Sequence, residues 1–279
     1  MQTKQYALIG KTLGYSYSPL IHNTLFSAAG AAAEYGLLEW QPRELEAGMA
    51  RVRAQFDGCN VTVPYKQAVI PYLDEITGEA AAVGAVNTIC RQNGRLIGHN
   101  TDGEGFLRSL PAEMRALQGK RVLVCGAGGA ARVIVYRLLK AGAQVEILNR
   151  TPENARALLQ ALAPHTAVRN ARCISDAEGD YALCVNTTPV GMLELCGRSP
   201  IRAEQAARCA YVYDCIYNPA QTRLLQDAAI AGRTGQNGFD MLWHQAVCAQ
   251  EVWGYSYSEA VLTAIHRNIY ERIFFENKE

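Results

Sequence analysis

The chain has 279 residues, with 27 lysines and arginines against 26 aspartates and glutamates. This length allows one large domain or two moderate ones, and an apolar fraction of 49% is enough to bury a sizeable core. The near balance of charge argues against a nucleic-acid surface or an anionic membrane as a partner, but one or two local positive charges would suffice to bind a small anion.

The N-terminal residues and the cysteines favour a cytoplasmic protein. The first residues, MQTKQYALIG, include no apolar stretch of signal-peptide length, and no apolar run approaches the roughly 18 residues of a membrane span. The cysteines form no CxxC pair, and several lie in apolar, strand-like runs such as Val122–Cys125. We therefore expect reduced, buried thiols, with neither a metal site nor a disulfide. We also expect no membrane or nucleic-acid partner, and a monomer or homodimer.

Apolar, strand-like runs alternate with amphipathic segments of helical length, and the chain contains no internal repeat. In its first part, a proline at position 42 suits the first turn of a helix, and Asn93-Gly94 predicts a tight hairpin turn. The elements expected there are strands at Tyr6–Gly10, Tyr35–Trp40, Gly58–Val63, Asn87–Cys90 and Arg95–Gly98, with helices from near Pro19 and from Pro42.

A second unit is expected to begin near Thr101. A helical segment lies between two of its strand-like runs, and this strand–helix–strand order predicts parallel strands joined by a right-handed crossover. The strands expected here are Lys120–Cys125, Gln144–Asn149, Tyr181–Asn186 and Tyr211–Ile216. The expected helices are Glu104–Met114, Ala130–Ala141, Phe239–Val252 and Ser256–Phe275.

A glycine-rich turn joins the first strand and helix of this crossover. Residues Gly126–Ala131 fit the pattern G-x-G-x-x-A, with an apolar strand before them and a helix after them. Glycines let a pyrophosphate approach the backbone, and a helix N-terminus adds free N–H groups and the positive end of its dipole. The pattern predicts a Rossmann-type dinucleotide site, with an ordinary ligand-free turn as the alternative.

The end of the next strand bears on which dinucleotide binds. An NAD site usually has an acidic residue there, about 20 positions after the glycines, to accept hydrogen bonds from the ribose. Here the strand ends in Asn149-Arg150-Thr151, and Glu146 lies three residues too early. We interpret Glu146 as a strand residue on a polar face. Arg150 can pair with a 2′-phosphate through its planar fork of donors, which favours NADP.

Two serines precede the helix expected near Pro19. Ser16 and Ser18 are separated by one residue, so they can present two hydroxyls together beside the positive end of that helix. This arrangement predicts a cradle for a carboxylate. A simple N-cap, in which Ser18 caps a helix that starts at Pro19, is a second interpretation that leaves Ser16 free to contact a ligand.

Six further runs follow this serine cluster in order, and together the set resembles the shikimate dehydrogenase family. The resemblance extends from about Ile9 to Ala246, which is most of the chain. No single run is decisive, but the ordered set is specific. The runs are Asn60–Lys66, Gly84–Thr88, Gly98–Gly103, Asn186–Met192, Tyr213–Pro219 and Gly238–Ala246.

The resemblance implies roles for individual residues. Lys66 and Asp102 would be the catalytic pair. The substrate carboxylate would bind Ser16 and Ser18. The residues implied to bind the ring hydroxyls or line the site are Thr62, Asn87, Asp102, Tyr217 and Gln245. The residues implied to bind NADP are Gly126, Ala127, Gly128, Gly129, Ala130, Asn149, Arg150 and Thr151, with Thr188, Ile216 and Gly238 near the nicotinamide end.

The chemistry of a ring-ketone reduction agrees with this assignment. Such a reaction needs a hydride donor and a proton source at the carbonyl oxygen. A lysine ammonium can donate that proton and stabilise the developing alkoxide, while a carboxylate holds the lysine and the substrate hydroxyl in position. Alone, Lys66 would be interpreted as an exposed lysine at a helix start and Asp102 as a helix N-cap.

The resemblance therefore implies an α/β protein that reversibly reduces 3-dehydroshikimate to shikimate with NADPH, on the path to aromatic amino acids. We expect residues 1–101 to form a substrate-binding catalytic domain and residues 102–237 a Rossmann-type, doubly wound parallel-sheet domain. Residues 238–279 would be helices that pack back on the first domain. Two alternatives stay open: a quinate/shikimate dehydrogenase that uses NAD, and a non-catalytic sensor that binds shikimate or a dinucleotide.

Overall fold

The computed structural model describes residues 3–14 and 16–276, so Tyr15 of the serine cluster lies outside the described residues. The chain forms two compact units. Unit 1 comprises Met1–Thr101 and Gln245–Glu279, and unit 2 comprises Asp102–His244. The second division falls after His244, within one continuous helix, and not at Gly238 as the sequence suggested. The reason is local: the Gly238 N–H donates to the Ile216 carbonyl at 3.0 Å, which fastens the start of that helix to unit 2.

Unit 1 contains a six-stranded mixed sheet with strand order β2-β1-β3-β5-β6-β4. The pairs β1–β2, β1–β3 and β4–β6 are parallel, whereas β3–β5 and β5–β6 are antiparallel. Asn93 and Gly94 both have positive φ, at 51° and 78°, and form the predicted hairpin between β5 and β6. The strands are β1 Lys4–Gly10, β2 Ala33–Glu39, β3 Gly58–Val61, β4 Glu75–Ile76, β5 Thr88–Gln92 and β6 Arg95–His99.

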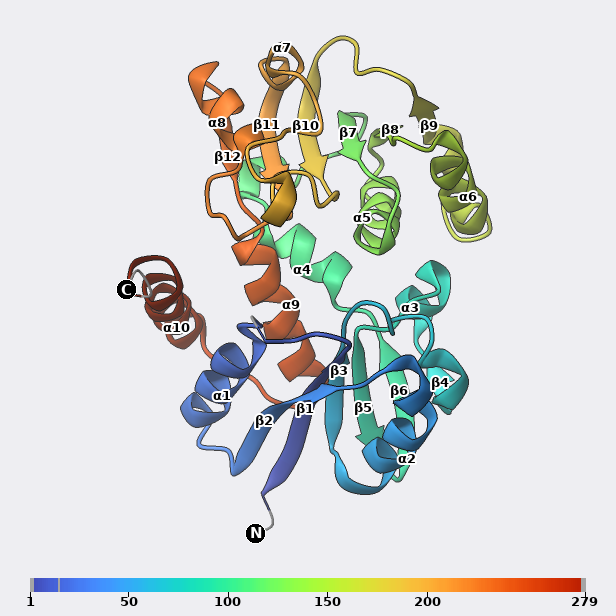
Figure 1. The fold of residues 1–279 in the computed structure, drawn as a ribbon, viewed down its shortest axis with the longest axis vertical. Coiled ribbons are helices and arrows are strands. Elements are labelled where there is room, and N and C mark those ends of the chain that lie inside the picture. Colours follow the sequence, from blue (N-terminus) through green and yellow to red (C-terminus); the bar gives the residue numbers. More distant parts are fainter. Residues whose placement is uncertain (1–2, 15, 277–279) are drawn as a thin grey trace. The chain divides into compact units, whose positions relative to one another are not determined.

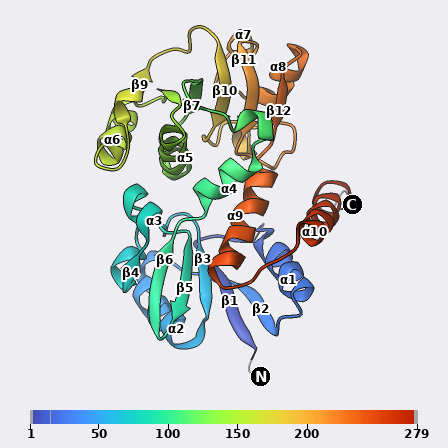
Figure 2. The same cartoon turned by 180° about the vertical axis from the view of Figure 1, so that it is seen from behind.

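Helices cover both faces of this sheet, because side chains that alternate along its strands are buried on each side (Figures 1 and 2). Ile9 and Val61 pack with Met49 of α2 on one face, while Tyr6 packs with Phe26 of α1 on the other. The helices of this unit are α1 Ser18–Ala28, α2 Leu45–Gln55, α3 Gly78–Val83 and α10 Glu259–Glu271, together with the later part of α9, which spans Phe239–Val252. Trp253, which follows α9, is buried in the same cluster as Tyr6, so the C-terminal segment completes unit 1.

The aromatic cluster of unit 1 contains a fully buried histidine. The His22 ring stacks on Tyr35 with centroids 4.3 Å apart. The Tyr257 hydroxyl donates to Gln250 Oε1, so the Gln250 amide nitrogen is turned towards His22 Nδ1, 3.0 Å away. Nδ1 is then the acceptor, and the neutral ring carries its proton on Nε2, which has no hydrogen-bond partner among the described residues. Burial lowers the pKa of His22 to about 3.

This histidine predicts a loss of stability in mild acid. The pKa of His22 is lower in the folded than in the unfolded state, so its contribution is fully present above the unfolded value of 6.5 and is lost as the pH falls below it. Between pH 7.5 and pH 5 we expect the free energy of unfolding to fall by about 2 kcal/mol through this residue. Urea titrations of wild type and His22→Gln should show a shallower pH dependence in the variant. The exposed His165→Gln should keep the wild-type slope, and equal slopes for all three proteins would contradict the assignment.

Unit 2 contains a six-stranded sheet of order β12-β11-β10-β7-β8-β9, in which every pair is parallel. From β7 the chain proceeds outwards to β9, then returns to β10 beside β7 and proceeds outwards in the other direction. This is the predicted doubly wound order, with its switch point between β7 and β10. The strands are β7 Arg121–Cys125, β8 Gln144–Leu148, β9 Ala171–Ile174, β10 Tyr181–Asn186, β11 Cys209–Asp214 and β12 Thr234–Gln236.

The helices of unit 2 follow from this winding. The crossover helices α5 and α6 lie on one face of the sheet, and α7 and α8 lie on the other (Figure 1). The helices are α4 Asp102–Ser109, α5 Gly129–Lys140, α6 Pro152–Leu162, α7 Ala203–Ala206 and α8 Arg223–Ile230. The 3₁₀ turns of the chain are Pro42–Glu44, Ile70–Tyr72, Ala112–Met114, Val168–Asn170 and Leu193–Leu195, and a π-helical turn spans Arg272–Glu276.

Across residues 3–14 and 16–276, none of the helices combines the length and apolar character needed to cross a membrane.

Candidate active site

The glycine turn of unit 2 lies at the switch point of its sheet. Gly126 follows β7 with φ at +111°, and its N–H donates to the Leu148 carbonyl at 2.9 Å. A Cβ at Gly126 would lie 2.5 Å from Thr187 Oγ1, so no other residue fits there. Gly128 and Gly129 are exposed, and a Cβ on either would meet no atom within 4 Å. The fold therefore requires glycine at position 126, whereas Gly128 and Gly129 adjoin open space.

These glycines stand at the N-terminus of α5, where free backbone N–H groups and the positive dipole end favour an anion. Ala127 and Ala130, from the same predicted set, lie within this turn and first helical turn and are partly buried. Gly128 and Gly129 adjoin open space, whereas Gly126 packs against Thr187. This geometry fits the pyrophosphate of a dinucleotide.

A cavity of about 770 Å³ lies at the carboxyl ends of the strands of unit 2. Its lining includes Cys125 at the end of β7, Asn149 and Arg150 after β8, and Thr188 after β10. The Asn149 amide donates to the Thr151 carbonyl at 2.7 Å, which fixes the loop that presents the exposed Arg150. The size suits a cofactor pocket, and a guanidinium at its edge suits a phosphate. Predicted cofactor residues that follow β8 and β10 thus line one cavity at the carboxyl end of the sheet, beside the end of β7.

Glu146 corrects one interpretation made from the sequence. It does not face solvent as a strand residue on a polar face, because only 6% of it is exposed. Arg121 and Arg172 donate to its carboxylate at 3.0 and 2.6 Å, and the Tyr181 hydroxyl donates at 2.6 Å. Burial alone would raise the pKa of Glu146, but these three donors keep it below its usual range. Glu146 is therefore committed to an ion-pair cluster and is not available to a ribose.

The remaining predicted cofactor residues lie after β10 and β11 and before α9. Thr188 is partly buried and Ile216 is buried. Gly238 approaches the backbone so closely that a Cβ would lie 2.1 Å from the Cys215 carbonyl oxygen. Glycine is required there, and the contact fixes the two segments against each other.

The serine cluster of unit 1 differs from the cap that we expected. Helix α1 begins at Ser18 itself, its N-cap is Tyr17, and no side chain caps it. Instead, the Ser18 N–H donates to Ser16 Oγ at 3.2 Å, so the earlier serine supplies the oxygen near the helix end. The prediction that Ser18 is the N-cap is therefore wrong, while both hydroxyls remain at the start of α1.

A chain of buried polar side chains connects Ser18 with Asn87. The Ser18 hydroxyl lies beside the Tyr35 phenol, whose pKa is raised chiefly by burial. Tyr35 donates to Asn60 Oδ1 at 2.8 Å, and Asn60 Nδ2 donates to the Asn87 carbonyl at 3.2 Å. Asn87 in turn accepts the Thr101 N–H at Oδ1, at 2.7 Å. Two predicted substrate residues are thus held in one network of buried hydrogen bonds.

Thr62 and Lys66 lie beside this network. The Thr62 N–H donates to the Ile9 carbonyl at the end of β1, at 2.9 Å. The Lys66 carbonyl accepts the Val86 N–H at 2.7 Å, which places Lys66 next to the segment that carries Asn87. Lys66 is partly buried in a turn between β3 and the next 3₁₀ turn, so it is not an exposed lysine at a helix start.

The predicted substrate residues are divided between the two units. Ser16, Ser18, Thr62, Lys66, Asn87 and Gln245 belong to unit 1, and Asp102 and Tyr217 belong to unit 2. Asp102 is the first residue of α4, Tyr217 follows β11, and Gln245 lies on α9. Each of these three is partly buried. Within unit 1, the Val61 N–H donates to the Asn87 carbonyl at 2.8 Å, so the segments that carry Thr62, Lys66 and Asn87 adjoin one another. The side chains of Tyr35 and Asn60 lie between Ser18 and Asn87.

Sequence reasoning missed the residues that support this arrangement in unit 1. Tyr35, Asn60 and Thr101 touch the predicted site residues but were given no role. The available signal was a polar residue within an apolar strand, as in Cys59-Asn60-Val61, because a buried amide there needs partners.

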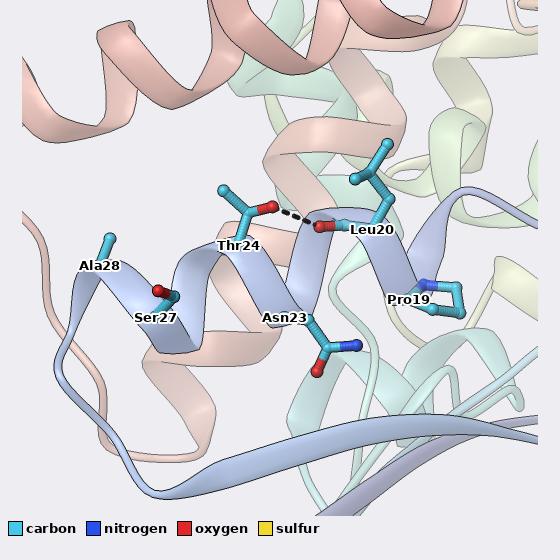
Figure 3. A pocket seen from close by; sticks show the side chains of 6 residues that line it. All are labelled: Pro19, Leu20, Asn23, Thr24, Ser27 and Ala28. Atoms are coloured by element: carbon cyan, nitrogen blue, oxygen red, sulfur yellow. Dashed lines mark hydrogen bonds between the residues drawn. The ribbon is translucent and has the colours of Figure 1, made fainter.

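A hollow over the outer face of α1 is separate from these residues. It is lined by Pro19, Leu20, Asn23, Thr24, Ser27 and Ala28 (Figure 3). Figure 3 shows Asn23 directed towards β2, where its amide donates to the Tyr35 carbonyl and accepts the Tyr35 N–H. No predicted site residue lines this hollow. Its contribution to the site is indirect, since Asn23 fixes the backbone of Tyr35.

Comparisons with known proteins agree with the geometry. The family model for the shikimate dehydrogenase substrate binding domain matches residues 8–89, and the model for shikimate / quinate 5-dehydrogenase matches residues 110–177. A shikimate dehydrogenase (NADP(+)) from Geobacillus kaustophilus (strain HTA426) is 42% identical, over 90% of this chain and 92% of its own length. Another from Shouchella clausii (strain KSM-K16) is 41% identical, over 90% of this chain and 93% of its own length.

A solved structure shares the fold. Shikimate 5-dehydrogenase from Thermus thermophilus, in complex with NADP(H) and shikimate, matches with a TM-score of 0.85 and 33% identity, over 95% of this chain and 99% of that one. The chain therefore belongs to the shikimate dehydrogenase family, as the order of its motifs indicated.

Proposed function

We propose that this chain interconverts 3-dehydroshikimate and shikimate with NADP(H), and that Lys66 and Asp102 perform the proton transfer. The family relationship supports the reaction. The observation that carries it in the structure is the open glycine turn beside a cavity with Arg150 at its edge, because this arrangement fits a phosphorylated dinucleotide.

Bound NADPH supplies the hydride, and the residues of the chain supply the rest. In the reductive direction, the Lys66 ammonium donates a proton to the carbonyl oxygen that becomes the new hydroxyl. Its charge also stabilises the alkoxide as it develops. In the oxidative direction, neutral Lys66 accepts the proton of that hydroxyl. Asp102, as a carboxylate, accepts a hydrogen bond from the same substrate hydroxyl and orients it.

We further propose how the substrate is held. Ser16 and Ser18 donate to its carboxylate from the start of α1, where the helix dipole favours negative charge. The residues that bind the ring hydroxyls or line the site are Thr62, Asn87, Tyr217 and Gln245. The buried chain through Tyr35 and Asn60 supports this proposal, since it fixes Ser18 and Asn87 before a ligand arrives. Little conformational entropy of the protein is then lost when the substrate binds.

Arg150 tests the choice of cofactor. Hydrogen bonds to a charged partner contribute roughly 1.5–3 kcal/mol, so Arg150→Ala should raise KM for NADPH about 10- to 100-fold. KM for NADH should change little, because NADH lacks the 2′-phosphate. Steady-state rates with each cofactor measure both values. The variant Arg198→Ala, at another exposed arginine, serves as a matched control. An equal rise in KM for NADPH and NADH would show that Arg150 does not bind the 2′-phosphate.

A second candidate is quinate as an additional substrate. The description of one matching family model names both shikimate and quinate. Ser18 favours shikimate as the substrate, because family members that prefer quinate often have threonine at that position. Turnover of shikimate and quinate, each with NADP+ and NAD+, separates the candidates. Quinate rates with NAD+ that match or exceed shikimate rates with NADP+ would favour the second.

We also propose a cytoplasmic protein that is a monomer or homodimer and needs no metal. Most of its cysteines are buried thiols, which suits a reducing compartment. Within the described part of the chain, no group of three His, Cys, Asp or Glu side chains is arranged to hold a metal ion. Light scattering after size-exclusion chromatography determines the oligomeric state, and activity that survives EDTA supports a metal-free reaction.

A further inference from the structure

Two buried side chains that the mechanism does not use lie beneath the predicted nicotinamide end of unit 2. Asn186 ends β10 and Asp214 ends β11, and neither side chain is exposed to solvent. Their residues are register partners on neighbouring parallel strands, and Asn186 Nδ2 donates to Asp214 Oδ1 at 3.0 Å. The pair therefore lies at the carboxyl edge of the sheet, where the loops that follow both strands begin.

Asn186 fixes the loop that carries Thr188. Its Oδ1 accepts both the Thr188 N–H at 3.0 Å and the Thr188 hydroxyl at 2.7 Å. Its Nδ2 also donates to the Val190 carbonyl at 3.2 Å, two residues further along the same loop. One amide side chain thus forms hydrogen bonds with three groups of this loop. These bonds fix both the backbone and the side-chain rotamer of Thr188.

Asp214 fixes the loop that carries Ile216 in the same way. Its carboxylate accepts the Ile216 N–H at 3.0 Å and the Thr222 hydroxyl at 2.7 Å, besides the Asn186 amide. Burial raises the pKa of Asp214 to about 6, and the donors only partly offset that effect. Burial destabilises the charged form of this carboxyl group, and the three hydrogen-bond donors around it compensate in part.

The two loops and the start of α9 are further tied to one another. A Cβ at Gly191, in the first loop, would lie 3.3 Å from Ile216 Cδ1 and 3.4 Å from Thr222 Cβ in the second. The Ile216 carbonyl accepts the Gly238 N–H at 3.0 Å. Thr188, Ile216 and Gly238, the three residues that we place near the nicotinamide, are therefore all anchored directly or indirectly on the Asn186–Asp214 pair.

We propose that Asn186 and Asp214 are positioning residues for hydride transfer: they orient the nicotinamide end of the cofactor through Thr188, Ile216 and Gly238. This inference rests on the proposed function, because it needs those three residues to face the cofactor. It predicts that damage to the pair disturbs the reacting end of the dinucleotide and spares the end that carries the 2′-phosphate, which Arg150 binds.

The test compares three variants by steady-state kinetics with NADPH and with NADPH deuterated at the transferred position. Asp214→Ala removes the carboxylate that holds the Asn186 amide, the Ile216 N–H and the Thr222 hydroxyl. Since misplacement of reacting groups can cost about 100-fold, we expect kcat to fall at least about tenfold. The primary isotope effect on kcat should rise, because hydride transfer becomes slower than the other steps. Binding of 2′,5′-ADP should stay within about threefold of wild type, because that ligand lacks the nicotinamide and shares no partner with Asp214.

Asp214→Asn is the conservative partner of this variant. Its amide oxygen can keep the bonds from Asn186 and Ile216, and its nitrogen can donate to Thr222, so it should restore most of kcat and the wild-type isotope effect. Asp227→Ala is the matched control. Asp227 is also a buried aspartate of unit 2, with 6% exposure, but it pairs with Arg223 on α8 at 2.7 Å and not with either loop. Its variant can lower stability but should leave the isotope effect unchanged.

Thr222→Val keeps the question answerable if Asp214→Ala does not fold, because it removes a single donor from the carboxylate. It should raise the isotope effect by a smaller amount. An unchanged isotope effect in both variants, equal losses of 2′,5′-ADP and NADPH binding, or an Asp214→Asn protein as impaired as Asp214→Ala would overturn the positioning role. Absence of NADPH turnover in the wild-type protein would instead contradict the proposed function itself, so the two failures are distinguishable.

Discussion

Replacing Lys66 by alanine is expected to abolish most turnover of shikimate. General acid–base catalysis by a positioned side chain contributes about 100- to 10,000-fold, and kcat should fall by an amount in that range. The binding of NADPH should not change, because Lys66 belongs to unit 1 and the glycine turn to unit 2. Initial rates with saturating shikimate, together with fluorescence titration of NADPH, measure the two quantities separately.

The control for this variant is Lys11→Ala, which removes an exposed lysine of the same unit. It should keep the wild-type kcat. A Lys66→Ala protein that retains wild-type rates would mean that another group carries the proton. A parallel loss of NADPH binding would mean that the substitution disturbs the protein more widely than the proposed role allows.

Replacing Gly128 by valine is expected to block the dinucleotide without unfolding the protein. The residue has φ −85° and ψ −165°, an extended conformation that valine adopts readily, and a Cβ there meets no atom of the protein within 4 Å. The added side chain would occupy the space through which a pyrophosphate approaches the backbone. We expect the Kd of NADPH to rise at least about 100-fold, or roughly 3 kcal/mol.

Two other glycines make this result specific. Gly126→Ala should lower the melting temperature as well as NADPH binding, because its Cβ collides with Thr187 at a φ that favours glycine. Gly78→Ala, in the open first turn of α3 in unit 1, should change neither. Calorimetry and NADPH titration of the three variants separate these patterns. Tight NADPH binding by a folded Gly128→Val protein would show that the cofactor does not use this turn.

The parts of the fold that local sequence determines were predictable. The glycine turn, the hairpin at Asn93-Gly94 and the parallel order of the second sheet each depend on a few neighbouring residues or on the alternation of strand and helix. The family resemblance added the site residues, which no single pattern specifies. The short edge strands β4, β9 and β12, with two, four and three residues, were missed because so few residues carry no clear periodicity.

The remaining differences arise from contacts between distant residues. Glu146 could not be recognised as buried from its strand alone, because Arg121 and Arg172 lie 25 and 26 residues away in the sequence. The bond between Tyr35 and Asn60 likewise spans 25 residues. The prediction that Ser18 is the N-cap was wrong for a local reason: the helix begins one residue before the proline, so Ser18 lies in its first turn. Polar residues within apolar strands were the one signal of these networks that the sequence offered.

The most direct test of the proposed reaction is the absorbance of reduced nicotinamide when the purified protein receives shikimate with NADP+. We predict a steady increase that requires shikimate, is much faster with NADP+ than with NAD+, and disappears in the Lys66→Ala protein. A folded wild-type protein that binds NADP+ yet produces no reduced cofactor from shikimate would contradict the proposal.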